Sequence, residues 1–206
     1  MTIKRTKTLP ILSDVALARS LFIALTAQKE MLKMNCLVVG GSGFIGSHLV
    51  QKLLEDNHEI TVLDLRKPIQ DVPWYCIDIQ TGDRSLNLKG FEIVYHLASI
   101  SNARRCSELP DACYSTNVIG TLNIVQAALR HNVDRIILAS SSWLAGAQIG
   151  SITSEESPFS LSDINTIYGA SKLSQEVILY AHLGEFKGPS YTILRYGIPY
   201  GERMWR

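Results

Sequence analysis

Hydrophobic positions along this chain follow two alternating spacings. Continuous apolar runs at Leu37–Val39 and Ile60–Leu63 predict strands that are buried on both faces, as in a parallel sheet. Between these runs, apolar residues recur every three or four positions, which predicts an amphipathic helix. The residues that carry this helical spacing are Ile45, Leu49, Val50, Leu53 and Leu54. The first unit is therefore strand, turn, helix, strand.

The same alternation continues downstream. The predicted strands cover residues 92–96, 134–142 and 190–197, and the predicted helices cover residues 117–132 and 168–183. Strands that alternate with helices indicate a parallel sheet covered on both faces. We therefore expect an α/β fold, a Rossmann-like doubly wound parallel sheet that binds its ligands at the carboxyl ends of the strands.

Residues 1–33 differ in character from the rest. The stretch "MTIKRTKTLP" is basic, and residues 14–32 carry apolar side chains at mainly helical spacing. Asp14 and Arg19 interrupt the apolar run, which argues against a signal peptide, and no later run approaches the roughly 20 apolar residues of a membrane span. We expect an N-terminal extension at 1–33, a domain at 34–206 and a cytoplasmic protein. Met34 precedes the first strand, so the extension is either an added helix or the result of a misplaced start.

Composition narrows the function classes. The chain has 206 residues, 46% of them hydrophobic, and a net charge of +1, which suits about one domain and shows no basic excess for binding nucleic acid. Its cysteines show no paired short spacing, so we expect reduced thiols, with neither a disulfide framework nor a zinc site. These cysteines are Cys36, Cys76, Cys106 and Cys113. The histidines also lack the spacing of metal ligands, so no metal is expected.

Glycines follow the first strand at a fixed spacing. Gly40, Gly43 and Gly46 stand three apart, and Asp64 ends the second apolar run. A glycine turn lets the backbone approach a pyrophosphate closely, and the helix that follows points free N–H groups at it. An acid about 20 residues beyond can accept hydrogen bonds from an adenosine ribose. This order predicts a dinucleotide site.

A second group of residues carries chemistry. Tyr168 and Lys172 in "YGASK" are four apart and share one face of a predicted helix. We expect the lysine ammonium to lower the pKa of the tyrosine, which would then serve as a general base. The stretch "ASSSWLAG" at the end of the preceding strand offers a serine hydroxyl to hold a substrate hydroxyl next to the phenol.

These motifs, taken in order, carry a resemblance to a known family. The segments "VVGGSGFIGSHL", "VLDL", "CIDI", "VYHLAS", "NVIGT", "ASSSWLAG", "YGASK" and "LRYGIPYGER" match the order and approximate spacing of the extended short-chain dehydrogenase/reductases. The chain most resembles their nucleotide-sugar epimerase/dehydratase branch, of the UDP-glucose 4-epimerase-like kind. The resemblance spans residues 34 to about 203. It implies NAD as cofactor, a nucleotide-diphosphate sugar as substrate and a homodimer as one possible assembly.

The resemblance also assigns residues. It implies that the pyrophosphate is enclosed by Gly40, Gly43, Phe44, Ile45 and Gly46, the ribose by Asp64, the adenine by Asp78 and Ile79, and the rest of the cofactor by Leu97, Ala98, Ser99 and Asn117. For Asn117, a purely structural role as the cap of its helix is nearly as well supported as a position close to the cofactor. Tyr168 would be the base, and Lys172 would hold the nicotinamide ribose.

The catalytic serine and the choice of cofactor each leave an alternative. Counting back from Gly146 gives Ser141, whereas matching the serine run from its left end gives Ser142. Ser141 is our choice. Asp64 would repel the 2′-phosphate of NADP and so favours NAD, although Arg66 and Lys67 keep NADP open. The implied reaction is transient oxidation of a sugar hydroxyl by NAD, followed by reduction from the other face.

Several positions depart from the family pattern. Ser142 and Trp143 stand where a dehydratase carries Asp and Glu, which disfavours dehydration. Ile198 replaces the usual Asn near the substrate, and Glu202 replaces a Pro. The chain ends at Arg206, where family members continue, so we expect it to lack most of the C-terminal substrate domain. A non-catalytic NAD(H)-binding module is the alternative function.

Overall fold

The computed structural model describes residues 33–81, 86–145, 164–186 and 188–204. The chain divides into two compact units, Met1–Lys33 and Met34–Arg206. The helical pattern expected near the N-terminus lies outside the described residues, as does Gly146.

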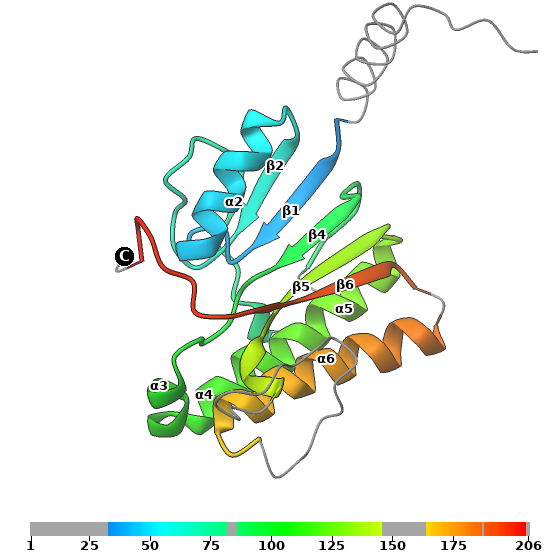
Figure 1. The fold of residues 1–206 in the computed structure, drawn as a ribbon. Helices are drawn as coiled ribbons and strands as arrows, with labels where there is room; N and C mark the ends of the chain where they lie inside the picture. Colours follow the sequence, from blue (N-terminus) through cyan, green and yellow to red (C-terminus); the bar gives the residue numbers. More distant parts are fainter. Residues whose placement is uncertain (1–32, 82–85, 146–163, 187, 205–206) are drawn as a thin grey trace, which may run out of the picture. The chain divides into compact units, whose positions relative to one another are not determined.

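Six parallel strands form one sheet in the order β3-β2-β1-β4-β5-β6 (Figure 1). The strands are β1 (Asn35–Val39), β2 (Glu59–Leu63), β3 (Trp74–Tyr75), β4 (Ile93–His96), β5 (Arg135–Ser141) and β6 (Ser190–Tyr196). Strand order reverses between β1 and β4, and in open sheets of this kind ligands bind in the crevice at such a switch point. The predicted Rossmann-like sheet is therefore confirmed.

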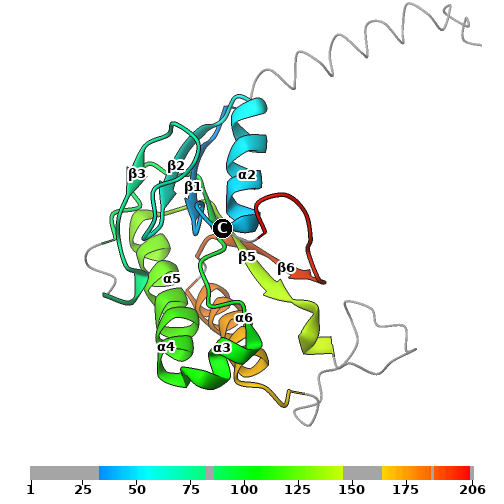
Figure 2. The same cartoon turned by 90° about the vertical axis from the view of Figure 1, so that its left-hand side faces the viewer.

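Helices cover both faces of the sheet, with α2 on one face and α5 and α6 on the other (Figures 1 and 2). The helices are α2 (Phe44–Glu55), α3 (Ala103–Glu108), α4 (Pro110–Tyr114), α5 (Gly120–His131) and α6 (Ile167–Glu185). The short helical segments are η1 (Ile79–Thr81), the π-helical η3 (Ser115–Ile119) and η4 (Ser142–Ala145).

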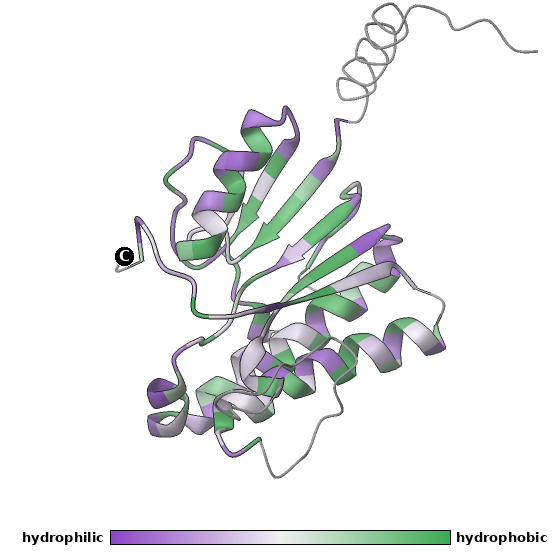
Figure 3. Cartoon of the chain, viewed as in Figure 1, coloured by the Kyte–Doolittle hydropathy of each residue, from purple (hydrophilic) through white to green (hydrophobic). Residues whose placement is uncertain are grey.

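Alternate residues of β1 enter two separate cores. Leu37 and Val39 pack with α5 and α6, whereas Cys36 and Val38 pack with α2 and β2. All four are at most 1% exposed. Burial on both faces is why the central strands are apolar throughout rather than alternating (Figure 3).

The structure corrects the predicted helix at 117–132. Helical backbone already begins at Pro110 and runs through the π-helical segment into α5, which ends at Asn132 in a left-handed conformation. The pattern signalled neither α3 nor α4, because helices of six and five residues are too short to show a helical repeat. The two-residue strand β3 was missed for the same reason.

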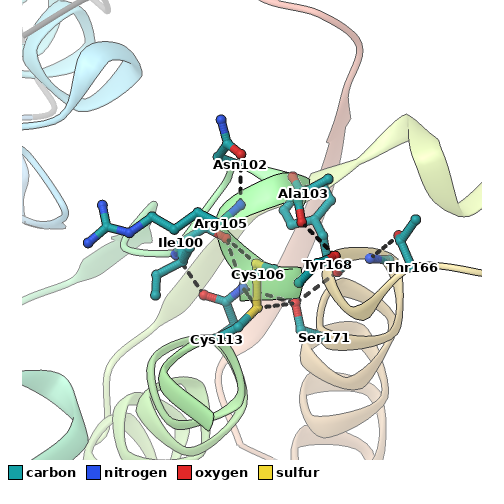
Figure 4. The surroundings of a disulfide bond; sticks show 12 residues. Ile100, Asn102, Ala103, Arg105, Cys106, Cys113, Thr166, Tyr168 and Ser171 are labelled. Atoms are coloured by element: carbon teal, nitrogen blue, oxygen red, sulfur yellow. Dashed lines mark hydrogen bonds between the residues drawn. A yellow bond between two sulfur atoms is a disulfide. The ribbon is translucent and has the colours of Figure 1, made fainter. Parts of the chain in front are cut away.

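The prediction that all four cysteines are reduced thiols is wrong for two of them. Cys106 and Cys113 form a disulfide between α3 and α4, with their Cα atoms 5.1 Å apart (Figure 4). Their sequence separation gave no signal, because only the turn between the two short helices brings them together. Tyr168 packs against both sulfur-bearing residues. Cys36 and Cys76 remain free thiols.

Candidate functional site

A cavity of about 1070 Å³ opens at the carboxyl ends of the strands. It takes in the β1–α2 turn, the ends of β2, β4 and β5, the start of α6 and the segment after β6. Of the site residues predicted from sequence, those that line it are Gly40, Gly43, Phe44, Ile45, Gly46, Asp64, Asp78, Ile79, Leu97, Ala98, Ser99, Ser141, Tyr168 and Lys172. Asn117 is the exception.

Gly40 and Gly46 stand where the structure leaves no space for a side chain. Gly40 has a φ of +86°, and a Cβ added there would lie 2.6 Å from the backbone nitrogen of Ala98. A Cβ on Gly46 would overlap the Gly40 carbonyl oxygen and lie 2.7 Å from the Cα of Gly41. The first turn of α2 therefore packs closely at Gly46 against the turn that follows β1.

The start of α2 presents backbone donors to the cavity. Gly43 is the N-cap, and no side chain makes a capping hydrogen bond there. The first N–H groups of a helix have no partner within the helix, and the helix dipole makes this end positive. Gly43, Phe44 and Ile45 all line the cavity. The turn fits a pyrophosphate, because its donors are backbone groups and its shape excludes a Cβ.

Asp64 connects the glycine turn to the end of β2. One carboxylate oxygen accepts from the Ser42 N–H at 3.0 Å, and the other accepts from the Arg66 N–H at 2.9 Å. The Ser42 hydroxyl donates to the Arg66 carbonyl at 2.6 Å. Each carboxylate oxygen can accept a second hydrogen bond. The carboxylate is thus fixed in place and can still accept from a diol.

Asp78 and Ile79 are expected to flank an adenine, and residues of α5 support Ile79. Ile79 is 4% exposed, and its carbonyl accepts from the Asn123 side chain at 2.7 Å. The Asp78 carboxylate accepts from the Gln80 N–H at 3.0 Å. Gly120 of α5 approaches Ile79 so closely that a Cβ there would meet its side chain at 2.5 Å. This wall of the cavity is rigidly supported by α5.

Asn117 lies behind the cavity wall. It is fully buried, its side-chain oxygen accepts from the Ile100 N–H at 2.8 Å, and its amide nitrogen donates to the Ile100 carbonyl at 3.1 Å. The amide nitrogen also lies 2.9 Å from the Ser171 hydroxyl. In the structure, Asn117 therefore neither lines the cavity nor caps a helix. Asn117 anchors the loop after β4, and Ile100 of that loop lines the cavity.

The start of α6 places Tyr168 and Lys172 beside the end of β5. Thr166 caps the helix by accepting from the Gly169 N–H at 3.0 Å. Lys172 is 3% exposed, and its Nζ donates to the Ala139 carbonyl at 2.9 Å. The same nitrogen lies 5.9 Å from the centroid of the Tyr168 ring. Sequence separation of four thus brings both side chains to the cavity floor.

The expected lowering of the Tyr168 pKa by Lys172 is wrong, because the pKa of Tyr168 is raised above its usual value. Burial raises the pKa of Tyr168, and its side-chain hydrogen bond with Ser141 opposes that rise. The pKa of Lys172 is itself lowered to about 8, mainly by burial, with the charge of Glu176 acting in the opposite direction. The group that favours the phenolate in this structure is therefore the Ser141 hydroxyl rather than the lysine.

The two candidate serines occupy different environments. Ser141 is 4% exposed and lines the cavity, and its hydroxyl accepts from the Trp143 N–H at 3.3 Å. Ser142 is exposed and does not line the cavity. Trp143 packs edge-on against Tyr168, with ring centroids 6.0 Å apart. The register that selects Ser141 is the one that brings a serine to Tyr168.

Sequence reasoning missed a buried ion pair behind this serine run. Glu176 is 6% exposed and receives two hydrogen bonds from Arg195 of β6, at 3.0 and 2.8 Å. The Ser140 hydroxyl donates to the same carboxylate. The three groups tie α6 to β5 and β6. Only Glu176 carried a local signal, because it lies four residues from Lys172 on the same helix.

Other cavity residues were also missed. Arg105, Ala112 and Thr116 come from the unpredicted helical region, and the segment after β6 contributes Ile198. Ile198 is 80% exposed. Sequence reasoning had noted Ile198 only as a departure from the family.

The described residues offer neither a metal site nor a membrane-spanning helix. No group of three or more His, Cys, Asp or Glu side chains there could hold a metal ion. In the same part of the chain, none of the helices has the length and apolar character needed to cross a bilayer.

A family model and individual relatives both match most of this chain. The family model for the "NAD dependent epimerase/dehydratase family" matches residues 36–206. A putative UDP-glucose 4-epimerase of Methanocaldococcus jannaschii is 35% identical over 180 residues, which cover 82% of this chain and 57% of that protein.

Solved structures show the same similarity. The UDP-glucose 4-epimerase of Thermotoga maritima, crystallised with UDP-glucose, superposes with a TM-score of 0.74 at 30% identity, over 82% of this chain and 57% of that one. MoeE5, solved with UDP-glucose and NAD, gives a TM-score of 0.68 at 28% identity, over 78% and 53%. The chain thus spans little more than half the length of these relatives.

Proposed function

The chain belongs to the NAD-dependent epimerase/dehydratase family, and on this premise we propose that it is the NAD-binding and catalytic part of an epimerase that acts on nucleotide-diphosphate sugars. One observation carries the proposal. A single cavity is lined both by the glycine turn with Asp64 and by Ser141, Tyr168 and Lys172. A dinucleotide bound at the first group would extend toward the second.

The binding half of the proposal rests on shape and charge. The N–H groups at the start of α2 would donate to the pyrophosphate, and the Asp64 carboxylate would accept from the adenosine ribose. Lys172, whose ammonium already points at the end of β5, would donate to the second ribose. Because Asp64 is anionic and anchored, a 2′-phosphate would be repelled, which favours NAD over NADP.

The chemical half rests on the groups around Tyr168. Bound NAD would supply the hydride acceptor and donor. Ser141 would hold the sugar hydroxyl and Tyr168 would take its proton, then return it after the keto sugar has turned. The hydrogen bond with Ser141 lowers the pKa of Tyr168 against the effect of burial, so the serine both orients the substrate and tunes the base.

Dehydration is less well supported than epimerisation. Among the described residues that line the cavity, the only carboxylates belong to Asp64 and Asp78, and both lie on the side assigned to the adenosine. Elimination of water needs a second acid–base pair next to the sugar. Where a dehydratase carries one, this chain has Ser142 and Trp143.

One observation favours a second function, cofactor binding without turnover. In the segment after β6, Ile198 lines the cavity and is 80% exposed, and Tyr200 nearby in the chain is 87% exposed. A site that faces water does not hold the nucleotide half of its substrate, and binding energy from that half contributes to the rate. We therefore expect the 206-residue chain to bind NAD and to turn over sugars poorly.

Two measurements on the purified chain separate these outcomes. Calorimetry with NAD tests binding, and incubation with NAD and a panel of UDP-, GDP- and dTDP-sugars tests turnover, with epimers and reduced cofactor as readouts. Binding with weak, Tyr168-dependent epimerisation supports the proposal. Binding without epimers supports the second function. Absence of NAD binding would refute both.

A further inference from the structure

His96, the last residue of β4, carries a buried imidazole that the proposed reaction does not use. The side chain is 1% exposed. Its backbone pairs with Leu138, and β5 then continues beyond the end of β4. The next carbonyl of β5, that of Ala139, accepts from the Lys172 ammonium at 2.9 Å. His96 thus pairs with Leu138, and the Lys172 ammonium binds the carbonyl of the next residue of β5, at the same end of the sheet.

The hydrogen bonds of the Thr121 hydroxyl establish which ring nitrogen of His96 is protonated. The Thr121 hydroxyl donates its only hydrogen to the Asn117 carbonyl at 2.6 Å. Its oxygen accepts from the Gln175 amide nitrogen at 2.6 Å and lies 2.8 Å from His96 Nε2. Since the hydroxyl has no second hydrogen, His96 Nε2 must be the donor. Nδ1 is then a lone-pair acceptor.

Two buried acceptors in this cluster lack a donor. Among the residues that the structure describes, neither His96 Nδ1 nor the Gln175 side-chain oxygen has a hydrogen-bond partner. An unsatisfied buried acceptor is destabilising, so such groups normally bind an ordered water. Gln175 lies three residues after Lys172 on the same face of α6. The Lys172 ammonium has two further hydrogens besides the one given to Ala139.

We propose that His96 is a positioning residue for Lys172, and that His96 Nδ1 and the Gln175 oxygen bind one internal water whose oxygen accepts from the Lys172 ammonium. The water donates to both acceptors, so every group in the cluster is satisfied. Lys172 is then held from two sides, by the Ala139 carbonyl and by the water. This inference rests on the proposed function only for the task that Lys172 performs.

The charges around the ammonium agree with this arrangement. The ammonium acts electrostatically on His96 of β4, and on α6 it lies near the Tyr168 ring and the Glu176 carboxylate. Arg195 of β6 is paired with Glu176, and α5 presents the uncharged Thr121. Burial and the charge of Lys172 lower the pKa of His96 to about 3, so the imidazole stays neutral. A neutral acceptor stabilises the ammonium, whereas an imidazolium would repel it.

The chain offers a matched pair of substitutions. In His96→Asn the side-chain oxygen occupies roughly the place of Nδ1, so the water keeps its acceptor. In His96→Gln the amide reaches roughly the place of Nε2, so Thr121 keeps its donor and the water loses an acceptor. A purely structural histidine would tolerate Gln at least as well as Asn. A histidine that positions Lys172 should tolerate Asn better than Gln.

The test is NMR of the protein without cofactor, with the Lys172 signal assigned by its loss in Lys172→Arg. In the wild type, the Lys172 pKa is about 8. His96→Gln should lower this midpoint by roughly one pH unit, a ten-fold change in proton affinity, and Gln175→Met should lower it by less. His96→Asn and the control Ser174→Ala, which removes a hydrogen bond to the Ala170 carbonyl on the same helix, should leave it unchanged.

Nitrogen shifts of His96 give an independent readout. The proposal requires a proton on Nε2 and none on Nδ1 from pH 5 to 9. A proton on Nδ1, or an unchanged Lys172 midpoint in folded His96→Gln, would overturn it. Should His96→Gln not fold, Gln175→Met decides by the same criterion. All these readouts precede cofactor addition, so failure of NAD to bind would refute the proposed function and leave this inference standing.

Discussion

The two halves of the cavity are built in different ways. The half formed by β1, α2 and β2 presents backbone N–H groups at a turn where Gly40 and Gly46 exclude side chains, together with the Asp64 carboxylate. The half around Tyr168 consists of side chains from β5, α6 and β6, tied together by the Glu176–Arg195 ion pair. The first half is encoded within about thirty consecutive residues, whereas the second depends on the sheet bringing distant segments together.

The sharpest way to separate the halves is to disable the second alone. In a form that turns over nucleotide sugars, Tyr168→Phe removes the base and should lower turnover by roughly 10²- to 10⁴-fold. NAD affinity, measured by calorimetry, should stay within about three-fold, because the ring remains. A variant with wild-type turnover would contradict the assignment of Tyr168.

The first half can be broken without touching the second. Gly46→Ala places a methyl group against the Gly40 carbonyl, and overpacking of this kind costs about 1–3 kcal/mol, so NAD affinity should fall roughly 10- to 100-fold. Gly184→Ala is the control, because a Cβ on this α6 glycine meets nothing within 4 Å. The control should keep NAD affinity and be slightly more stable. Equal NAD affinity in both variants would show that close packing at Gly46 is not required.

The disulfide supports the second half only. Reduction of Cys106–Cys113 should lower the free energy of unfolding by about 2 kcal/mol, because the bond closes a short loop in the unfolded chain. Urea denaturation with and without reductant measures this change, and Cys106→Ser combined with Cys113→Ser should reproduce it. A thiol titration of the unreduced, denatured protein should find Cys36 and Cys76 alone among the four cysteines. Four reactive thiols would show that the bond is absent.

The smallest expected effect concerns Asp64, which tests how the first half chooses between NAD and NADP. Asp64→Asn keeps a hydrogen-bonding side chain but removes the charge, so NAD affinity should fall roughly ten-fold and discrimination against NADP should weaken. Calorimetry with both cofactors measures the two changes. Discrimination as strong as in the wild type would mean that Asp64 does not select the cofactor, and Arg66 would then be the next residue to vary.

Much of the fold followed from local pattern. The long strands and helices were predicted because double-sided burial makes whole strands apolar and single-sided burial gives helices a periodic stripe. The same logic placed Tyr168 and Lys172 on one face of α6, Gly40 and Gly43 in the turn before α2, and Gly46 in the first turn of that helix. The two-residue strand β3 and the short helices α3 and α4 escaped, because each is shorter than the repeat that would reveal it.

Tertiary structure decided the properties that depend on what surrounds a group. The sequence placed a lysine next to a tyrosine, but burial, rather than the lysine, dominates the pKa of Tyr168, and Ser141 supplies the opposing hydrogen bond. It offered Asn117 as a cofactor contact, but packing put that side chain behind the wall. Periodicity and glycine spacing are local, so the sequence alone determined the long strands and helices and the glycine turn. Desolvation, the ion pair and the disulfide arise only where distant segments meet, so the folded structure had to decide them.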